Sequence, residues 1–214
     1  MERQEQMSYR VIAREATGEI VEKKSRFIAT MVPVSGEDAA AAFLDAMRKR
    51  YYDARHNCYA YIIGKDTRTE RSSDDGEPSG TAGRPMLEVL RGAGLTDVAA
   101  VVTRYFGGVL LGTGGLVRAY TQALQAAVEN SEMITMRGGV QYTVSADYTL
   151  TGKLQHLFAT EGVFVKDTIY SEQVTFCIVI PPALEEKLKK SMIELSSGRL
   201  FLEKNGYSYY EERN

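Results

Sequence analysis

Residues 101–120 are VVTRYFGGVLLGTGGLVRAY, the most distinctive stretch of the chain. The apolar residues up to Phe106 predict a strand, and two glycine turns then lead to a helix expected from Leu116. Five of the 19 glycines of the chain fall between 107 and 115. A second loop rich in glycine, SDDGEPSGTAG, lies upstream at 73–83. We therefore expect any functional surface to involve these two loops.

The composition is that of a folded protein with no strong charge. The chain has 214 residues, of which 44% are hydrophobic, enough to form the core of one large domain or two small ones. The formal net charge is −2, and a division near residue 136 leaves each part with one more acidic than basic residue. This balance disfavours a protein that binds nucleic acid through a basic surface as a whole, but it does not exclude a local basic patch.

The sequence predicts a cytoplasmic protein. Its N-terminus, MERQEQMSYR, is polar and lacks the apolar segment of a secretion signal, and no run of 18 apolar residues predicts a membrane span. The two cysteines, Cys58 and Cys177, are expected on strands as reduced thiols. With two histidines and no CxxC motif, the sequence predicts no metal site and no cofactor.

The first part of the chain alternates strands and helices. Pro85 is suited to open a helix, and Ser35 is a candidate cap for an earlier one. The charged segment 65–75 is assigned neither a strand nor a helix. The expected strands are at 8–34, 59–63 and 97–106, and the expected helices are at 37–51, 85–91 and 116–130.

The second part of the chain has a different order of elements. Strands are expected at 139–147, 163–170, 173–180 and 199–210, with helices at 150–161 and after Pro182. The resulting order, βαββαβ, is that of the ferredoxin-like fold. We therefore predict an α+β protein with two domains, 1–136 and 137–214.

The glycine loops do not match the usual nucleotide-binding motifs. A P-loop needs a lysine after its glycines and a dinucleotide loop needs GxGxxG, whereas Gly112-Thr-Gly114-Gly-Leu-Val117 has neither. The helix that follows could still bind an anion at its N-terminus. The glycines could equally serve only to form tight turns. Both interpretations remain open.

Catalytic and metal-binding interpretations are weaker. Cys58 near His56 could be a nucleophile, but a buried structural thiol is the more usual role, and Ser79 lacks the GxSxG elbow. Asp74, Asp75 and Glu77 could hold a divalent ion, but they lack EF-hand spacing and are typical of an acidic turn.

Arginines and aromatic residues give the strongest indication of binding. Arg104, Tyr105 and Phe106 end a predicted strand, and Arg118 lies one turn into the next helix. Arginine beside an aromatic residue is typical of protein-binding hot spots and of surfaces on which nucleobases stack. Because side chains alternate along a strand, we expect one of the two aromatic rings to be accessible.

The motifs resemble those of the YigZ/IMPACT family over essentially the whole chain. The resemblance is carried by SDDGEPSGTAGRP at 73–85, VTRYFGG at 102–108 and LGTGGLVRAY at 111–120, and the segments KSRF at 24–27 and ARHNC at 54–58 also fit it. It implies an IMPACT domain similar to the fourth domain of elongation factor G. It also implies a C-terminal domain similar to the fifth domain of that factor.

The resemblance also implies a function. Eukaryotic relatives are associated with translational control, through a further module that this sequence lacks, and bacterial members are suspected to contact RNA or the translation machinery. Our leading hypothesis is a non-enzymatic regulator of translation that binds RNA or the ribosome. The alternatives are an enzyme or binder of a small phosphorylated or carboxylated ligand at the same loops, and a protein-binding adaptor. The predicted binding residues are Arg55, His56, Asp74, Asp75, Glu77, Arg104, Tyr105, Phe106, Gly107, Gly108, Gly112, Gly114, Gly115 and Arg118.

Overall fold

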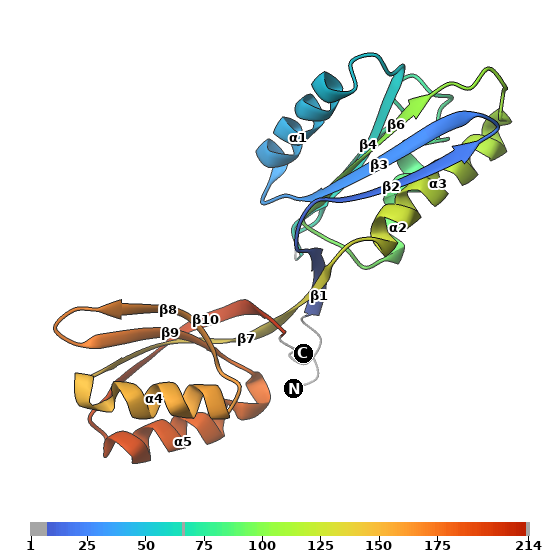
Figure 1. Ribbon diagram of the computed structural model, residues 1–214. Coiled ribbons are helices and arrows are strands. Elements are labelled where there is room, and N and C mark those ends of the chain that lie inside the picture. The colour runs from blue at the N-terminus through green and yellow to red at the C-terminus, as the bar shows by residue number, and fades with distance from the viewer. Residues whose placement is uncertain (1–7, 66, 213–214) are drawn as a thin grey trace. The chain divides into compact units, whose positions relative to one another are not determined.

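The computed structural model describes residues 8–65 and 67–212 and confirms an α+β fold in two parts (Figure 1). The described chain contains two five-stranded sheets and five α-helices. It divides into a compact unit of residues Tyr9–Thr135 and a second unit that holds the residues from Met136 onward.

The N-terminal unit is built on an antiparallel sheet with strand order β2-β3-β6-β4-β5. The central strand β6 therefore lies between two strands that precede it in the sequence. The elements of this unit are β1 (Ser8–Ile12), β2 (Ala16–Glu22), β3 (Ser25–Pro33), α1 (Glu37–Arg50), β4 (His56–Ile63), β5 (Thr69–Ser73), α2 (Gly83–Gly92), β6 (Val98–Tyr105) and α3 (Gly112–Glu129).

Helices cover both faces of this sheet (Figure 1). Val98, Ala100 and Val102 of β6 belong to the core that α2 and α3 form on one face. Ala99 and Val101 belong to the clusters beneath α1 on the other face. Because both faces of β6 are buried, the strand is almost continuously apolar, as its sequence indicates.

Two local predictions were wrong, and one strand was missed. Helix α3 begins at Gly112 and not at Leu116, so two further glycines lie in its first turn. The charged segment after β4 contains the missed strand β5, which pairs with β4 at the edge of the sheet and can keep polar residues on its open side. Ser35 does not cap α1, since the capping position is Gly36 and no side chain bonds there.

The second unit has the predicted ferredoxin-like order. Its strands are arranged β10-β7-β9-β8, and β1 also pairs with β7. The rings of Phe158 and Phe176 meet edge to face, 5.4 Å between centroids, in the core between sheet and helices. The elements are β7 (Met133–Ala146), α4 (Tyr148–Thr160), β8 (Phe164–Tyr170), β9 (Val174–Ile180), a 3-10 turn (Pro182–Leu184), α5 (Glu185–Ser196) and β10 (Phe201–Glu211).

None of the helices in residues 8–65 and 67–212 combines the length and the apolar character needed to cross a bilayer.

Candidate functional site

The strand register brings the two glycine-rich loops to the same end of the N-terminal sheet. His56 at the start of β4 is opposite Arg104 near the end of β6, and Tyr59 is opposite Ser73 at the end of β5. The loop after β5 and the loop after β6 therefore leave the sheet at neighbouring positions. Figure 1 shows the β6–α3 loop extending past the end of the strand.

Asp74 holds the first loop in shape. Its Oδ1 accepts hydrogen bonds from the backbone N–H groups of Ala82 and Gly83, both at 2.9 Å, and its Oδ2 accepts one from Gly80 at 2.8 Å. Burial alone would raise the pKa of Asp74, but these three donors outweigh burial and the net pKa is lowered. The carboxylate of Asp74 is thus occupied in capping the start of α2.

Asp75 attaches the same loop to β4. Its Oδ2 accepts the backbone N–H of Asn57 at 2.6 Å, and its carbonyl oxygen lies 2.8 Å from Nδ1 of His56. Because a carbonyl can only accept, this bond requires a proton on Nδ1 of His56. Asp75 has a φ of 43°, in the left-handed region that aspartate tolerates better than most residues.

A buried ion pair joins the first loop to the end of β6. The Nη1 of Arg104 donates to Oε1 of Glu77 at 2.6 Å, and the two side chains are 8% and 3% exposed. The hydroxyl of Tyr120, on α3, donates to the same oxygen at 2.8 Å, and Sγ of Cys58 lies 3.3 Å from that hydroxyl and 3.0 Å from the carbonyl oxygen of Asp74. The four side chains, from β4, the first loop, β6 and α3, form one connected polar network inside the apolar core.

Arg104 is held from both sides. Its guanidinium carbon lies 5.4 Å from the ring centre of Phe27 and 5.6 Å from that of Phe106, distances at which a cation is attracted to an aromatic face. Its Nε is buried and has no hydrogen-bond partner among the described residues. The sequence suggested an accessible arginine here, whereas the structure buries this one.

The environment of Cys58 does not favour a nucleophile. Burial raises the pKa of its thiol to about 12, so the reactive thiolate is scarce at neutral pH. Burial also raises the pKa of its partner Tyr120. His56 directs Nδ1 to Asp75, and Ser79 is exposed on the loop.

A pocket of about 420 Å³ opens beside the ion pair, and we call it the motif pocket. It brings together six of the predicted binding residues from both loops and from β4. Apolar side chains of Pro78, Leu110, Leu111 and Leu116 form much of its remaining wall. The six are Arg55, His56, Glu77, Arg104, Phe106 and Gly112.

Eight of the predicted residues do not line this pocket, among them Tyr105 and Arg118. Tyr105 follows Arg104 on β6, and its hydroxyl donates to Asp53 at 2.8 Å, away from the motif pocket. Arg118 is exposed on α3 and folds back toward the first turn of that helix, where its Nη1 lies 3.9 Å from the position of a Cβ at Gly114.

The remaining predicted glycines shape the β6–α3 loop. Gly107 passes so close to the β2–β3 turn that a Cβ would lie 2.0 Å from the carbonyl carbon of Lys24, and its N–H donates to Oγ of Ser25 at 3.1 Å. Gly108 and Gly112 have φ of +86° and +72°. Gly115 lies in the first turn of α3. These glycines determine the backbone path of the loop.

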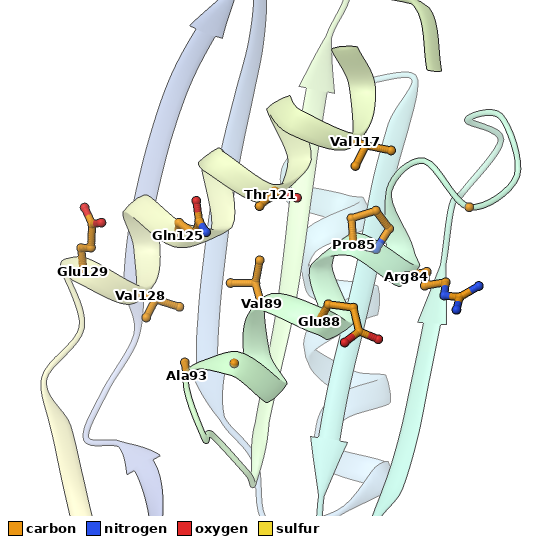
Figure 2. A pocket seen from close by; sticks show the side chains of 12 residues that line it. Arg84, Pro85, Glu88, Val89, Ala93, Val117, Thr121, Gln125, Val128 and Glu129 are labelled. Atoms are coloured by element: carbon orange, nitrogen blue, oxygen red, sulfur yellow. The ribbon is translucent and has the colours of Figure 1, made fainter. Parts of the chain in front are cut away.

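A second, larger hollow was not predicted. It measures about 770 Å³ and lies between α2 and α3, and we call it the helix groove. Figure 2 shows Val89 and Val128 pointing into the space between the two helices, with Glu88 and Glu129 near its edges. None of the predicted binding residues lines it. The spacing of Val117, Thr121 and Val128 along α3 was the available signal for it.

Residues 8–65 and 67–212 contain no group of three or more histidine, cysteine or acidic side chains arranged to hold a metal ion. The acids of the first loop show why: Asp74, Asp75 and Glu77 each turn a carboxylate oxygen to a different internal donor.

Comparison with known proteins identifies the family. Residues 23–128 match the Impact N-terminal domain, and residues 144–199 match a domain of unknown function (DUF1949). The chain is 38% identical to the IMPACT family member YvyE of Bacillus subtilis (strain 168) over 205 residues, which cover 96% of this chain and 94% of that protein.

Further relatives agree with this. The IMPACT family member YigZ of Escherichia coli (strain K12) is 38% identical over 183 residues, covering 84% of this chain and 89% of YigZ. A crystal structure described as a hypothetical protein superposes with a TM-score of 0.61 at 35% identity, covering 91% of this chain and 96% of that one. The chain belongs to the IMPACT family.

Proposed function

We propose that this IMPACT-family protein is a non-enzymatic regulator of translation that binds single-stranded RNA or the ribosome. One observation supports the proposal above others: an exposed aromatic ring and an exposed arginine line one pocket where the two loops meet. Phe106 is 53% exposed and lines the motif pocket with the exposed Arg55. Arg118 is exposed on the helix that follows the loop.

The chemistry of these residues favours unpaired RNA over a duplex. An accessible aromatic ring stacks on a base only where that base is unpaired, and arginine binds the adjoining phosphates. The net charge of −2 provides no broad basic surface for a duplex backbone. The resemblance to the IMPACT family implies domains similar to parts of elongation factor G, and this points to the translation machinery as the source of that RNA.

The proposal predicts weak binding with a shallow dependence on salt. Two phosphate contacts, from Arg55 and Arg118, give a slope of log K against log salt of about −1.4 for a single strand. Fluorescence anisotropy with a labelled single-stranded RNA measures this slope. Co-sedimentation with ribosomal particles measures association with the ribosome.

The variants separate this surface from the rest of the chain. We expect Phe106→Ala and Arg118→Ala to weaken binding, whereas Arg48→Ala, an exposed arginine of α1 on the opposite face of the sheet, leaves it unchanged. Arg104→Ala is not a suitable probe because that side chain is buried. Failure of single-stranded RNA, tRNA and ribosomal particles to bind at low salt would refute the proposal.

The helix groove favours a second candidate, a protein-binding adaptor. Its apolar floor and its length along two helices suit an amphipathic helix of a partner. In that case a co-purifying protein is lost in Val117→Asp and retained in Phe106→Ala. The reverse pattern would count against the adaptor.

A further inference from the structure

We propose that the motif pocket binds one unstacked nucleobase of a single-stranded RNA and leaves the phosphates outside. This inference rests on the proposed function and names the part of the RNA that the pocket recognises. It follows from the size of the pocket, the chemistry of its floor and the position of its charges.

The pocket has the size and walls for a flat ring. Its volume of about 420 Å³ lies in the range of roughly 300–1,000 Å³ that small-molecule sites occupy. Phe106 provides an aromatic face, and Leu110, Leu111 and Leu116 provide apolar contacts. Phe106 and Leu110 are 53% and 82% exposed, so a bound ring would cover apolar surface that now faces water.

The floor of the pocket offers both a donor and an acceptor. Among the described residues, the hydrogen bonds to the carboxylate of Glu77 both reach Oε1, from Arg104 and Tyr120. Among the residues that the structure describes, Nη1 of Arg104 bonds to Glu77 and the buried Nε has no partner. A nucleobase presents donors and acceptors side by side on one edge, which is the complement of a carboxylate beside a guanidinium.

The same floor disfavours a small anion. Glu77 is 3% exposed at its side chain and paired with Arg104, so the floor carries no net positive charge and an acceptor-only carboxylate faces part of it. A free phosphate or carboxylate bound there would meet a buried negative charge. The exposed cation of the pocket is Arg55, on the segment before β4, where it can contact a phosphate outside the pocket.

The decisive comparison is between octauridylate and an abasic strand of the same length, each labelled with fluorescein. Stacking on an aromatic side chain is worth about 5- to 150-fold in affinity per base, so we expect octauridylate to bind more tightly by that factor. Phe106→Ala should lose this advantage on octauridylate and change nothing on the abasic strand. Val109→Ala is the matched control, since Val109 is 43% exposed in the same loop and does not line the pocket.

Each outcome has a separate meaning. Equal affinity for the two strands, or equal effects of Phe106→Ala and Val109→Ala, overturns the pocket inference and leaves the proposed function standing. Failure of both strands and of ribosomal particles to bind overturns the proposed function as well. As a direct check, uridine 5′-monophosphate should shift the NMR signals of residues 76–78 and 110–113. Inorganic phosphate that produced the same shifts would contradict a site for the base.

Discussion

The buried pair between Glu77 and Arg104 provides the sharpest test of how the loops are held. In Glu77→Gln the amide oxygen can still accept the hydroxyl of Tyr120, but the guanidinium of Arg104 loses its counter-charge. We expect the Arg104 side chain, which is 8% exposed in the intact protein, to stay mostly buried because the strand and the two aromatic rings hold it. The substitution therefore leaves an unpaired and mostly buried charge.

The expected cost is large for a domain of this size. Removal of one partner of a buried ion pair costs about 3–5 kcal/mol, whereas a domain is stable by only about 5–15 kcal/mol in total. The double variant Glu77→Gln/Arg104→Met removes the stranded charge as well. We expect the double variant to be more stable than Glu77→Gln alone, because the attraction within a buried ion pair only roughly offsets the cost of removing both charges from water.

Hydrogen exchange followed by mass spectrometry along a urea titration measures the free energy of unfolding of the N-terminal unit, because peptides of residues 9–135 report separately from those of the second unit. The control is Glu132→Gln, which breaks a pair with Arg14 whose side chains are 59% and 78% exposed and should change stability by less than about 1 kcal/mol. If Glu77→Gln costs no more than Glu132→Gln, the argument from burial is wrong.

Three further predictions follow from single contacts. Gly107→Ala places a Cβ 2.0 Å from backbone and should prevent folding, whereas Gly108→Ala, with a φ of +86° and open space, should cost about 1–2 kcal/mol in a thermal melt. Cys58, with its pKa raised by burial to about 12, should resist iodoacetamide at pH 8 until urea unfolds the chain, and equal alkylation rates with and without urea would contradict its burial. Because the unfolded thiol ionises near its ordinary pKa of 9.0 and the folded thiol does not, the free energy of unfolding should fall as the pH rises between these two values. Asp74→Asn should flatten the acid limb of an unfolding titration, because the lowered pKa of Asp74 makes its contribution full above about pH 4 and lost as pH falls through the folded value; an unchanged acid limb would mean that the carboxylate charge is not what holds the loop.

The sequence predicted the elements whose pattern is local. The apolar run of β6 and the spacing of α1 gave their types and nearly their bounds, and the βαββαβ order of the second unit was evident from its alternating segments. Strand β5 was missed because an edge strand needs few apolar residues. The start of α3 was misplaced because glycine is a poor helix former. In the structure the first turn of α3 needs a small residue, since a Cβ at Gly115 would lie 3.0 Å from the Cβ of Leu111.

Six of the predicted binding residues line one pocket, and their role in binding stays a prediction. Both loops contribute to one pocket, as their unusual composition suggested. The sequence could not show that Arg104 pairs with Glu77, because these residues are 27 positions apart and meet only through the strand register. Nor could it show which side of β6 faces the pocket, and therefore that Arg104 lines the pocket while Tyr105 bonds to Asp53. Such facts depend on the whole sheet and have no local pattern.

The strand order β2-β3-β6-β4-β5 has a consequence for how the chain folds as it is synthesised. The hairpins β2–β3 and β4–β5 can each form as soon as their residues emerge, but each keeps one apolar edge open. The sheet closes only when β6, residues Val98–Tyr105, inserts between them. Pairings this distant in sequence form slowly, and the open edges are prone to join other chains in the meantime. A nascent chain that stops short of residue 98 therefore has two exposed edges and no ligand pocket, and it should depend on chaperones more than the finished protein does.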